Sequence, residues 1–132
     1  MHYRCVVLVP KSRINGAQTE KNIKATACEI FEEVMNCGWD YDWYVVGGRW
    51  SGTIKGKDVA LLDEELYNEE LKEYEGLENR KLGRVWYSPD IPVEKRQYCE
   101  PLFETHLVKP NYDKISKRMI GRYYLVIIDY HF

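Results

Sequence analysis

The chain has 132 residues and a formal net charge of −2, with 45% hydrophobic and 30% charged residues. This length fits a single domain, residues 1–132, and the composition is too apolar for a disordered chain. The charge balance does not indicate the strongly basic face that duplex DNA binding usually shows. No apolar stretch approaches the roughly 20 residues that span a bilayer.

The cysteines and the first residues bear on the cellular compartment. The four cysteines, at positions 5, 28, 37 and 99, show no C-x-x-C spacing, so reduced thiols in a cytoplasmic protein are expected. A zinc site built from these cysteines and the three histidines would need an unusually scattered arrangement. Residues 1–11 have a short apolar run without a cleavable small-residue site, which favours a first strand over a signal peptide. We therefore expect no metal, no cofactor and no membrane association.

The first third of the chain predicts a strand followed by a helix. Residues 3–10 contain an unbroken apolar run, Cys5 to Val9, which is typical of a central strand buried on both faces. Residues 11–18 form a polar loop with Asn15-Gly16 as its turn. Residues 19–37 predict a helix capped by Thr19, because apolar residues recur along one side at Ile23, Ala27, Ile30, Phe31 and Val34.

The rest of the chain predicts further strands, a second helix and an irregular segment. Residues 42–50 form a strand rich in aromatic and β-branched residues, with a turn at 51–52 into a short strand at 53–54. Residues 63–78 predict an acidic surface helix capped by Asp63. Residues 79–121 form a binding loop or conceal short elements, with 85–87 as a candidate strand and 94–98 as a candidate helical turn.

Residues 122–132 predict a second central strand, because both of its faces are apolar in the middle. The order of elements then favours an α+β fold. We expect a ferredoxin-like or related, mainly antiparallel sheet with its helices packed on one face.

The most distinctive segment is 40–52, DYDWYVVGGRWSG. Alternation along a strand places Trp43, Val45, Gly47 and Arg49 on one face and Tyr44, Val46, Gly48 and Trp50 on the other. Two glycines inside an aromatic strand indicate a bulge, or the close approach of a ligand or another backbone. The Arg49 guanidinium beside aromatic rings suits a phosphate or carboxylate attached to a planar ring. The alternative is a structural role, with Arg49 paired to Asp40 or Asp42.

Two further groups of residues are candidates for chemistry. Lys11 and Arg13 lie between a strand end and a helix N-terminus, where an anion is well placed, although a solvated loop is the alternative. Asp129 and His131 stand two apart on one face of the last strand, where a carboxylate can orient an imidazole as a general base. His106 is the candidate for the second histidine of a phosphodiester-cleaving pair.

Two segments together carry a family likeness. The segments DWYVVGGRWSG (42–52) and VIIDYHF (126–132) resemble a group of uncharacterised small bacterial and bacteriophage proteins. Those proteins carry a W-D-W-Y-x-x-G-G-R-W-type strand and a V-V-D-C-H-I-type C-terminus. Tyr130 here replaces the cysteine of that ending, so no role of the thiol carries over. The resemblance implies a phage-type accessory protein, for which a counter-defence role is expected.

These observations predict a protein that sequesters a small anionic, ring-bearing ligand, such as a nucleotide or a nucleotide-derived signal. The expected ligand-binding residues are Arg49, Trp50, Gly47, Gly48, Trp43, Tyr44, Lys11 and Arg13, with residues 88–110 closing over the ligand. Binding is favoured over catalysis because no nucleophile or metal set stands near this segment.

Two other functions stay open at this point. One is a phosphodiesterase or nuclease that uses His131 and Asp129, with His106. The other is a protein–protein inhibitor of a host defence factor, with exposed aromatic residues as anchors and the acidic segment 63–78 as a nucleic-acid mimic. The sequence also leaves open whether the chain forms a homo-oligomer.

Overall fold

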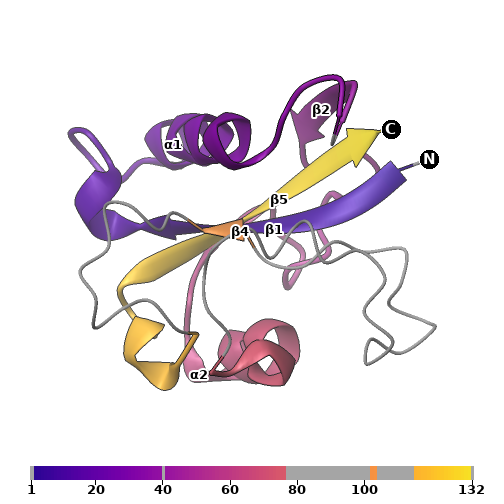
Figure 1. Cartoon of the computed structure of the whole chain (residues 1–132). Coiled ribbons are helices and arrows are strands. Elements are labelled where there is room, and N and C mark those ends of the chain that lie inside the picture. The colour runs from indigo at the N-terminus through magenta and orange to yellow at the C-terminus, as the bar shows by residue number, and fades with distance from the viewer. Residues whose placement is uncertain (1, 40, 77–101, 104–114, 132) are drawn as a thin grey trace.

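The computed structural model describes residues 2–39, 41–76, 102–103 and 115–131, whose strands form one five-stranded sheet (Figure 1). Its two central strands are β1 (His2–Pro10) and β5 (Tyr123–His131), which are antiparallel along all nine residue pairs. Both strands are buried through their middle. The prediction of two central strands from their apolar runs is therefore confirmed.

Short strands occupy the edges of the sheet. β2 (Trp43–Val46) and β3 (Val59–Leu61) pair one after the other with the outer edge of β5, and β4 (Leu102–Phe103) lies parallel to β1 on the other side. The predicted strand at 42–50 ends early, because Gly47 turns the chain with a φ of +79° and a 3₁₀ turn follows. The expected strand at 53–54 is only a bridge between Ile54 and Lys57.

The helix α1 (Glu20–Val34) covers one face of the sheet, as its apolar stripe predicts. Its start is capped by the Thr19 hydroxyl, which accepts a hydrogen bond from the main-chain N–H of Asn22 (3.2 Å). Because β5 lies between β1 and β2, the β1-α1-β2 unit is a split β-α-β arrangement.

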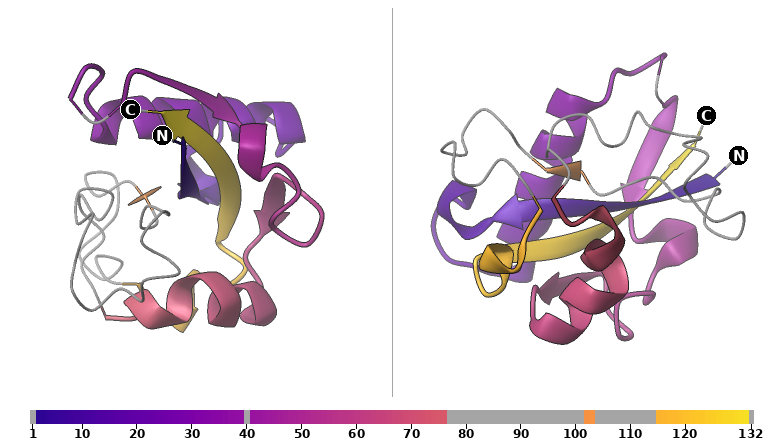
Figure 2. Two further views of the ribbon diagram at one scale, coloured as in Figure 1. Left: turned by 90° about the vertical axis from the view of Figure 1, so that its right-hand side faces the viewer. Right: turned by 60° about the horizontal axis from the view of Figure 1, so that its bottom comes forward.

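The second helical segment covers the opposite face. α2 (Glu64–Leu66) is capped by Asp63, whose carboxylate accepts a hydrogen bond from the Leu66 N–H (2.8 Å), and helical backbone continues to residue 74. Leu66, Tyr67 and Leu71 pack in one cluster with the β1 and β5 side chains that face away from α1. Figure 2 shows α1 and α2 on either side of the sheet.

The fold class is therefore confirmed as α+β, whereas the prediction that the helices share one face is wrong. The physical reason lies in β1 and β5, whose middles carry apolar side chains on both faces. Each apolar face needs its own covering layer to be removed from water.

Several predicted features lie outside the described residues. They are the short strand at 85–87, the helical turn at 94–98, the closing segment 88–110 apart from the described residues 102–103, Asp40 and His106. Within the ranges that are described, no helix combines the length and the apolar character needed to cross a membrane.

Candidate functional site

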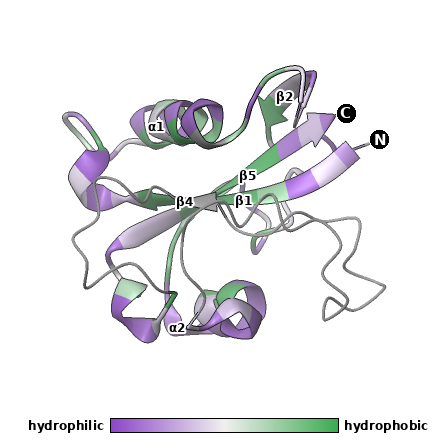
Figure 3. Ribbon diagram, viewed as in Figure 1, coloured by the Kyte–Doolittle hydropathy of each residue, from purple (hydrophilic) through white to green (hydrophobic). Residues whose placement is uncertain are grey.

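The α2-facing side of the sheet changes from apolar to polar toward one end of its central strands. Moving toward that end, the cross-strand pairs on this side are Val6–Ile127, Arg4–Asp129 and His2–His131. Figure 3 shows the change, with apolar colouring in the middle of β1 and β5 and polar colouring near the N and C labels. The strand β2 adds Trp43 and Val45 beside His131 and Asp129 on the same side. Residues far apart in sequence thus form one polar cluster.

Asp129 is the buried centre of this cluster. Its side chain is 2% exposed, and it accepts hydrogen bonds from Nδ1 of His2 (2.9 Å) and from the main-chain N–H of Arg49 (2.9 Å). A carboxylate can only accept, so Nδ1 of His2 carries the proton in this contact. In a neutral His2 the other ring nitrogen, Nε2, is then unprotonated.

His131 has a different carboxylate partner from the one expected. Its Nδ1 lies 2.8 Å from Oδ1 of Asp42, and this hydrogen bond holds the pKa of Asp42 below its usual value. The expected pairing of His131 with Asp129 is wrong. Residues two apart on a strand are separated by roughly 6.5 Å along it, whereas a neighbouring strand brings side chains to about 5 Å.

The two imidazoles and Trp43 form an aromatic cluster. The ring centroids of His2 and His131 are 5.3 Å apart, and the rings of Trp43 and His131 stack at 6.0 Å. Trp43 is 44% exposed, so one side of the cluster is open to solvent. Among the described residues, no hydrogen bond is made to Nε2 of either histidine. The site therefore presents two oriented imidazoles beside a large exposed ring.

The glycine pair makes room for two carboxylates. A Cβ added to Gly47 would lie 2.7 Å from Oδ2 of Asp58, and one added to Gly48 would lie 2.6 Å from Oδ2 of Asp129. Asp58 also accepts hydrogen bonds from the Ser51 hydroxyl (3.0 Å) and the Gly52 N–H (2.7 Å). The turn after β2 is thus fastened at two points, which explains why both positions are glycine.

Arg49 stands on this fastened turn. Its main-chain N–H is held by Asp129, and its side chain is exposed and makes no ion pair with another described residue. Asp42, one of its two predicted partners, pairs with His131 instead. The structure thus gives Arg49 a rigid main chain, whereas its guanidinium has no described partner.

The remaining predicted ligand-binding residues do not join this cluster. Lys11 and Arg13 follow the far end of β1. The rise per residue of a β-strand puts that end about 25 Å from His2. Arg13 pairs with Glu33 there, and Lys11 lies 5.9 Å from the centre of the Tyr124 ring. They therefore cannot hold the same phosphate group as Arg49.

The aromatic neighbours of Trp43 are divided between the two faces of the sheet. Tyr44 faces α1, where its hydroxyl donates a hydrogen bond to Glu32 (2.5 Å), and burial raises its pKa above the ordinary range. Trp50 is half-buried against the α2-side core. Only Trp43 of the three predicted stacking residues has its ring in the imidazole cluster.

The sequence reasoning missed two β1 residues that belong to this end of the sheet. His2 supplies the second imidazole, and Arg4 donates hydrogen bonds to both carboxylate oxygens of Glu70 (3.0 and 2.7 Å). The signal was present as alternation at the start of β1, where positions 2 and 4 are polar. These positions match the alternating Asp129 and His131 of β5.

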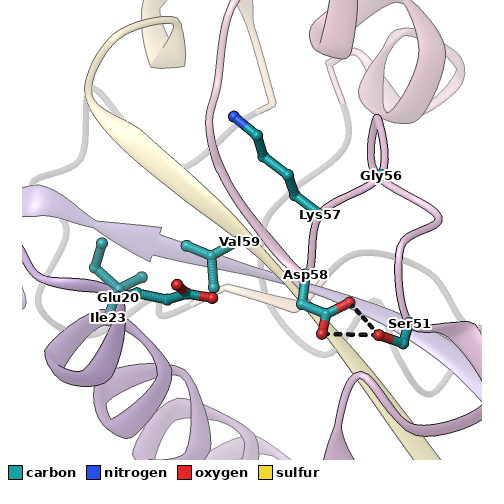
Figure 4. A pocket seen from close by; sticks show the side chains of 7 residues that line it. All are labelled: Glu20, Ile23, Ser51, Gly56, Lys57, Asp58 and Val59. Carbon is teal, nitrogen blue, oxygen red and sulfur yellow. Dashed lines mark hydrogen bonds between the residues drawn. The ribbon is translucent and has the colours of Figure 1, made fainter.

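A cavity of about 490 Å³ lies on the other side of the turn, between the start of α1 and the residues before β3 (Figure 4). It is lined by Glu20, Ile23, Ser51, Gly56, Lys57, Asp58 and Val59. One lysine stands there against two carboxylates, so the lining does not favour an anion. Asp58, one of these two carboxylates, already accepts a hydrogen bond from the Ser51 hydroxyl of the turn (Figure 4).

The acidic segment is partly neutralised within the chain. Glu70 pairs with Arg4, and Lys55 pairs with both Asp63 and Glu65. Across the described ranges, no group of three or more His, Cys, Asp or Glu side chains is arranged to hold a metal ion.

Comparison with protein-family models, curated proteins and solved structures found no match to this chain.

Proposed function

We propose that the chain binds and sequesters a small anionic, ring-bearing ligand, a nucleotide or a nucleotide-derived signal, at the end of the sheet formed by His2, Trp43, Arg49 and His131. One observation carries the proposal. The buried Asp129 carboxylate binds both the main-chain N–H of Arg49 and the ring of His2, so the exposed residue Arg49 is anchored through its main chain at the same end of the sheet as the exposed Trp43.

The chemistry of these groups suits a phosphate next to a flat ring. A guanidinium binds phosphate through paired N–H donors, and an exposed indole offers a face on which a base can stack. Rigid main-chain anchoring lowers the entropy lost when the ligand orders the turn. The main chain of Arg49 is anchored in this way because Gly48, which has no side chain, lets the Asp129 carboxylate reach it.

Magnitudes indicate that Arg49 and Trp43 are not sufficient alone. A base–aromatic stack contributes about 1–3 kcal/mol and a charge-assisted phosphate contact about 1.5–3 kcal/mol. Micromolar binding requires about 8 kcal/mol. The imidazoles of His2 and His131, when protonated, supply the additional charged donors. We therefore expect micromolar rather than nanomolar affinity.

The biological role follows from the resemblance of the segments 42–52 and 126–132 to phage-type proteins. We propose that sequestration of a nucleotide signal serves counter-defence in a phage-infected cell.

The test is a nucleotide panel in differential scanning fluorimetry, followed by isothermal titration calorimetry of every member that raises the melting temperature. Arg49→Ala should weaken the binding of such a member at least tenfold. The matched control is Arg118→Ala, because Arg118 is also exposed but lies just before the opposite end of β5. If no member stabilises the wild type, or if both variants bind equally well, the proposal is wrong.

A further inference from the structure

We propose that His2 and His131 form a general acid–base pair that cleaves a phosphodiester bond with a neighbouring ribose 2′-hydroxyl group. This inference rests on the proposed binding of a nucleotide-type ligand at the same site. It adds a reaction to that binding, and it assigns His2 a catalytic role that the sequence did not indicate.

The first observation is that both rings are held in the same way. Nδ1 of His2 lies 2.9 Å from Asp129, and Nδ1 of His131 lies 2.8 Å from Asp42. Each carboxylate fixes the orientation of its ring and the proton on Nδ1. Nε2 of both rings is therefore the atom that gives or takes a proton.

The second observation is that the two rings are close enough to act on one substrate. Their centroids are 5.3 Å apart with an interplanar angle of 72°, and the side chains of His2 and His131 are 25% and 33% exposed. A phosphate bound against this pair can have its attacking oxygen near one Nε2 and its leaving oxygen near the other. The nearby Arg49 offers positive charge to the phosphate oxygens in the transition state.

The reaction needs only two proton transfers. One neutral imidazole takes the proton of the ribose 2′-hydroxyl while O2′ forms a bond to phosphorus. The bond between phosphorus and the 5′-oxygen breaks, and the second, protonated imidazole gives its proton to that oxygen. The products are a 2′,3′-cyclic phosphate and a 5′-hydroxyl group, and exchange with solvent restores both rings. The attacking group is already part of the substrate, which favours this route over attack by free water.

Asparagine variants separate chemistry from structure. In His2→Asn and His131→Asn the side-chain amide still offers an N–H near the position of Nδ1, so the contact to Asp129 or Asp42 is kept while Nε2 is removed. The probe is a fluorescently labelled random RNA hexamer, and its DNA counterpart, which lacks the 2′-hydroxyl, reports binding without cleavage.

The wild type should convert the RNA hexamer to fragments ending in a cyclic phosphate, with a bell-shaped dependence of rate on pH. Each asparagine variant should lower the rate at saturating RNA at least 100-fold, so that the loss cannot come from weaker binding, while the DNA hexamer reports separately how much affinity each variant loses. RNA that is bound and recovered intact would overturn cleavage and leave the binding proposal standing. If neither hexamer binds, both proposals fail for this ligand class. Cleavage that persists in both variants would also refute the assignment.

Discussion

Replacing Gly48 by alanine tests whether the close approach of Asp129 holds the turn after β2. Gly48 has a φ of +56°, and a Cβ there would lie 2.6 Å from Oδ2 of Asp129 and 2.8 Å from Cγ1 of Val45. The positive φ alone costs an alanine about 1 kcal/mol. The Asp129 carboxylate must also move, which breaks at least one charge-assisted hydrogen bond at a cost of about 1.5–3 kcal/mol. We expect a total loss of about 2.5–4 kcal/mol.

The matched control for this change is Gly56→Ala. Gly56 has a φ of +77°, but a Cβ added there meets nothing within 4 Å. The control should therefore lose only about 1 kcal/mol. Urea unfolding followed by tryptophan fluorescence measures both values, provided that the slope m is unchanged. Equal losses in the two variants would refute the reasoning, because the positive φ would then account for the whole effect.

Three further predictions concern residues outside this turn. Arg4→Met and Glu70→Gln should each destabilise the fold by about 2–3 kcal/mol, and a double-mutant cycle should give a coupling of at least about 1 kcal/mol, because the pair is bidentate and mostly buried. Iodoacetamide at pH 8 should modify the exposed Cys37 before Cys28, whose pKa is raised by burial, and peptide mass spectrometry showing equal rates would contradict this. Burial raises the pKa of Tyr67 to about 12, so the unfolded chain loses this proton at lower pH than the folded chain does. The stability of the wild type should therefore fall between about pH 10 and 12, and the urea midpoint of Tyr67→Phe should fall less steeply with pH than that of the wild type.

The elements with strong local patterns were predictable. The apolar runs of β1 and β5, the stripe of α1 and the Thr19 and Asp63 caps depend on residues within a few positions of one another. Such patterns act through the periodicity of the backbone and through orphan N–H groups at helix starts. The short edge strand β3 was missed because three residues carry too little periodicity to be distinguished from a turn.

The glycine pair illustrates the limit of local reasoning. Its presence within an aromatic strand predicts a bulge, or the close approach of a ligand or another backbone, whereas the structure brings side chains against both glycines. What approaches is the chain's own carboxylates, Asp58 and Asp129, the second of which is 80 residues from the amide it accepts. No local pattern identifies that partner.

The sequence by itself determined the class of the fold and its central strands, because these follow from the periodicity of apolar residues. Only the tertiary structure decided which imidazole meets which carboxylate. The contact of His2 with Asp129 spans 127 positions and depends on the register of β1 against β5, and His131 reaches Asp42 at the start of β2. Strand register is set by long-range packing of both sheet faces, so it places together residues whose spacing in the chain carries no signal.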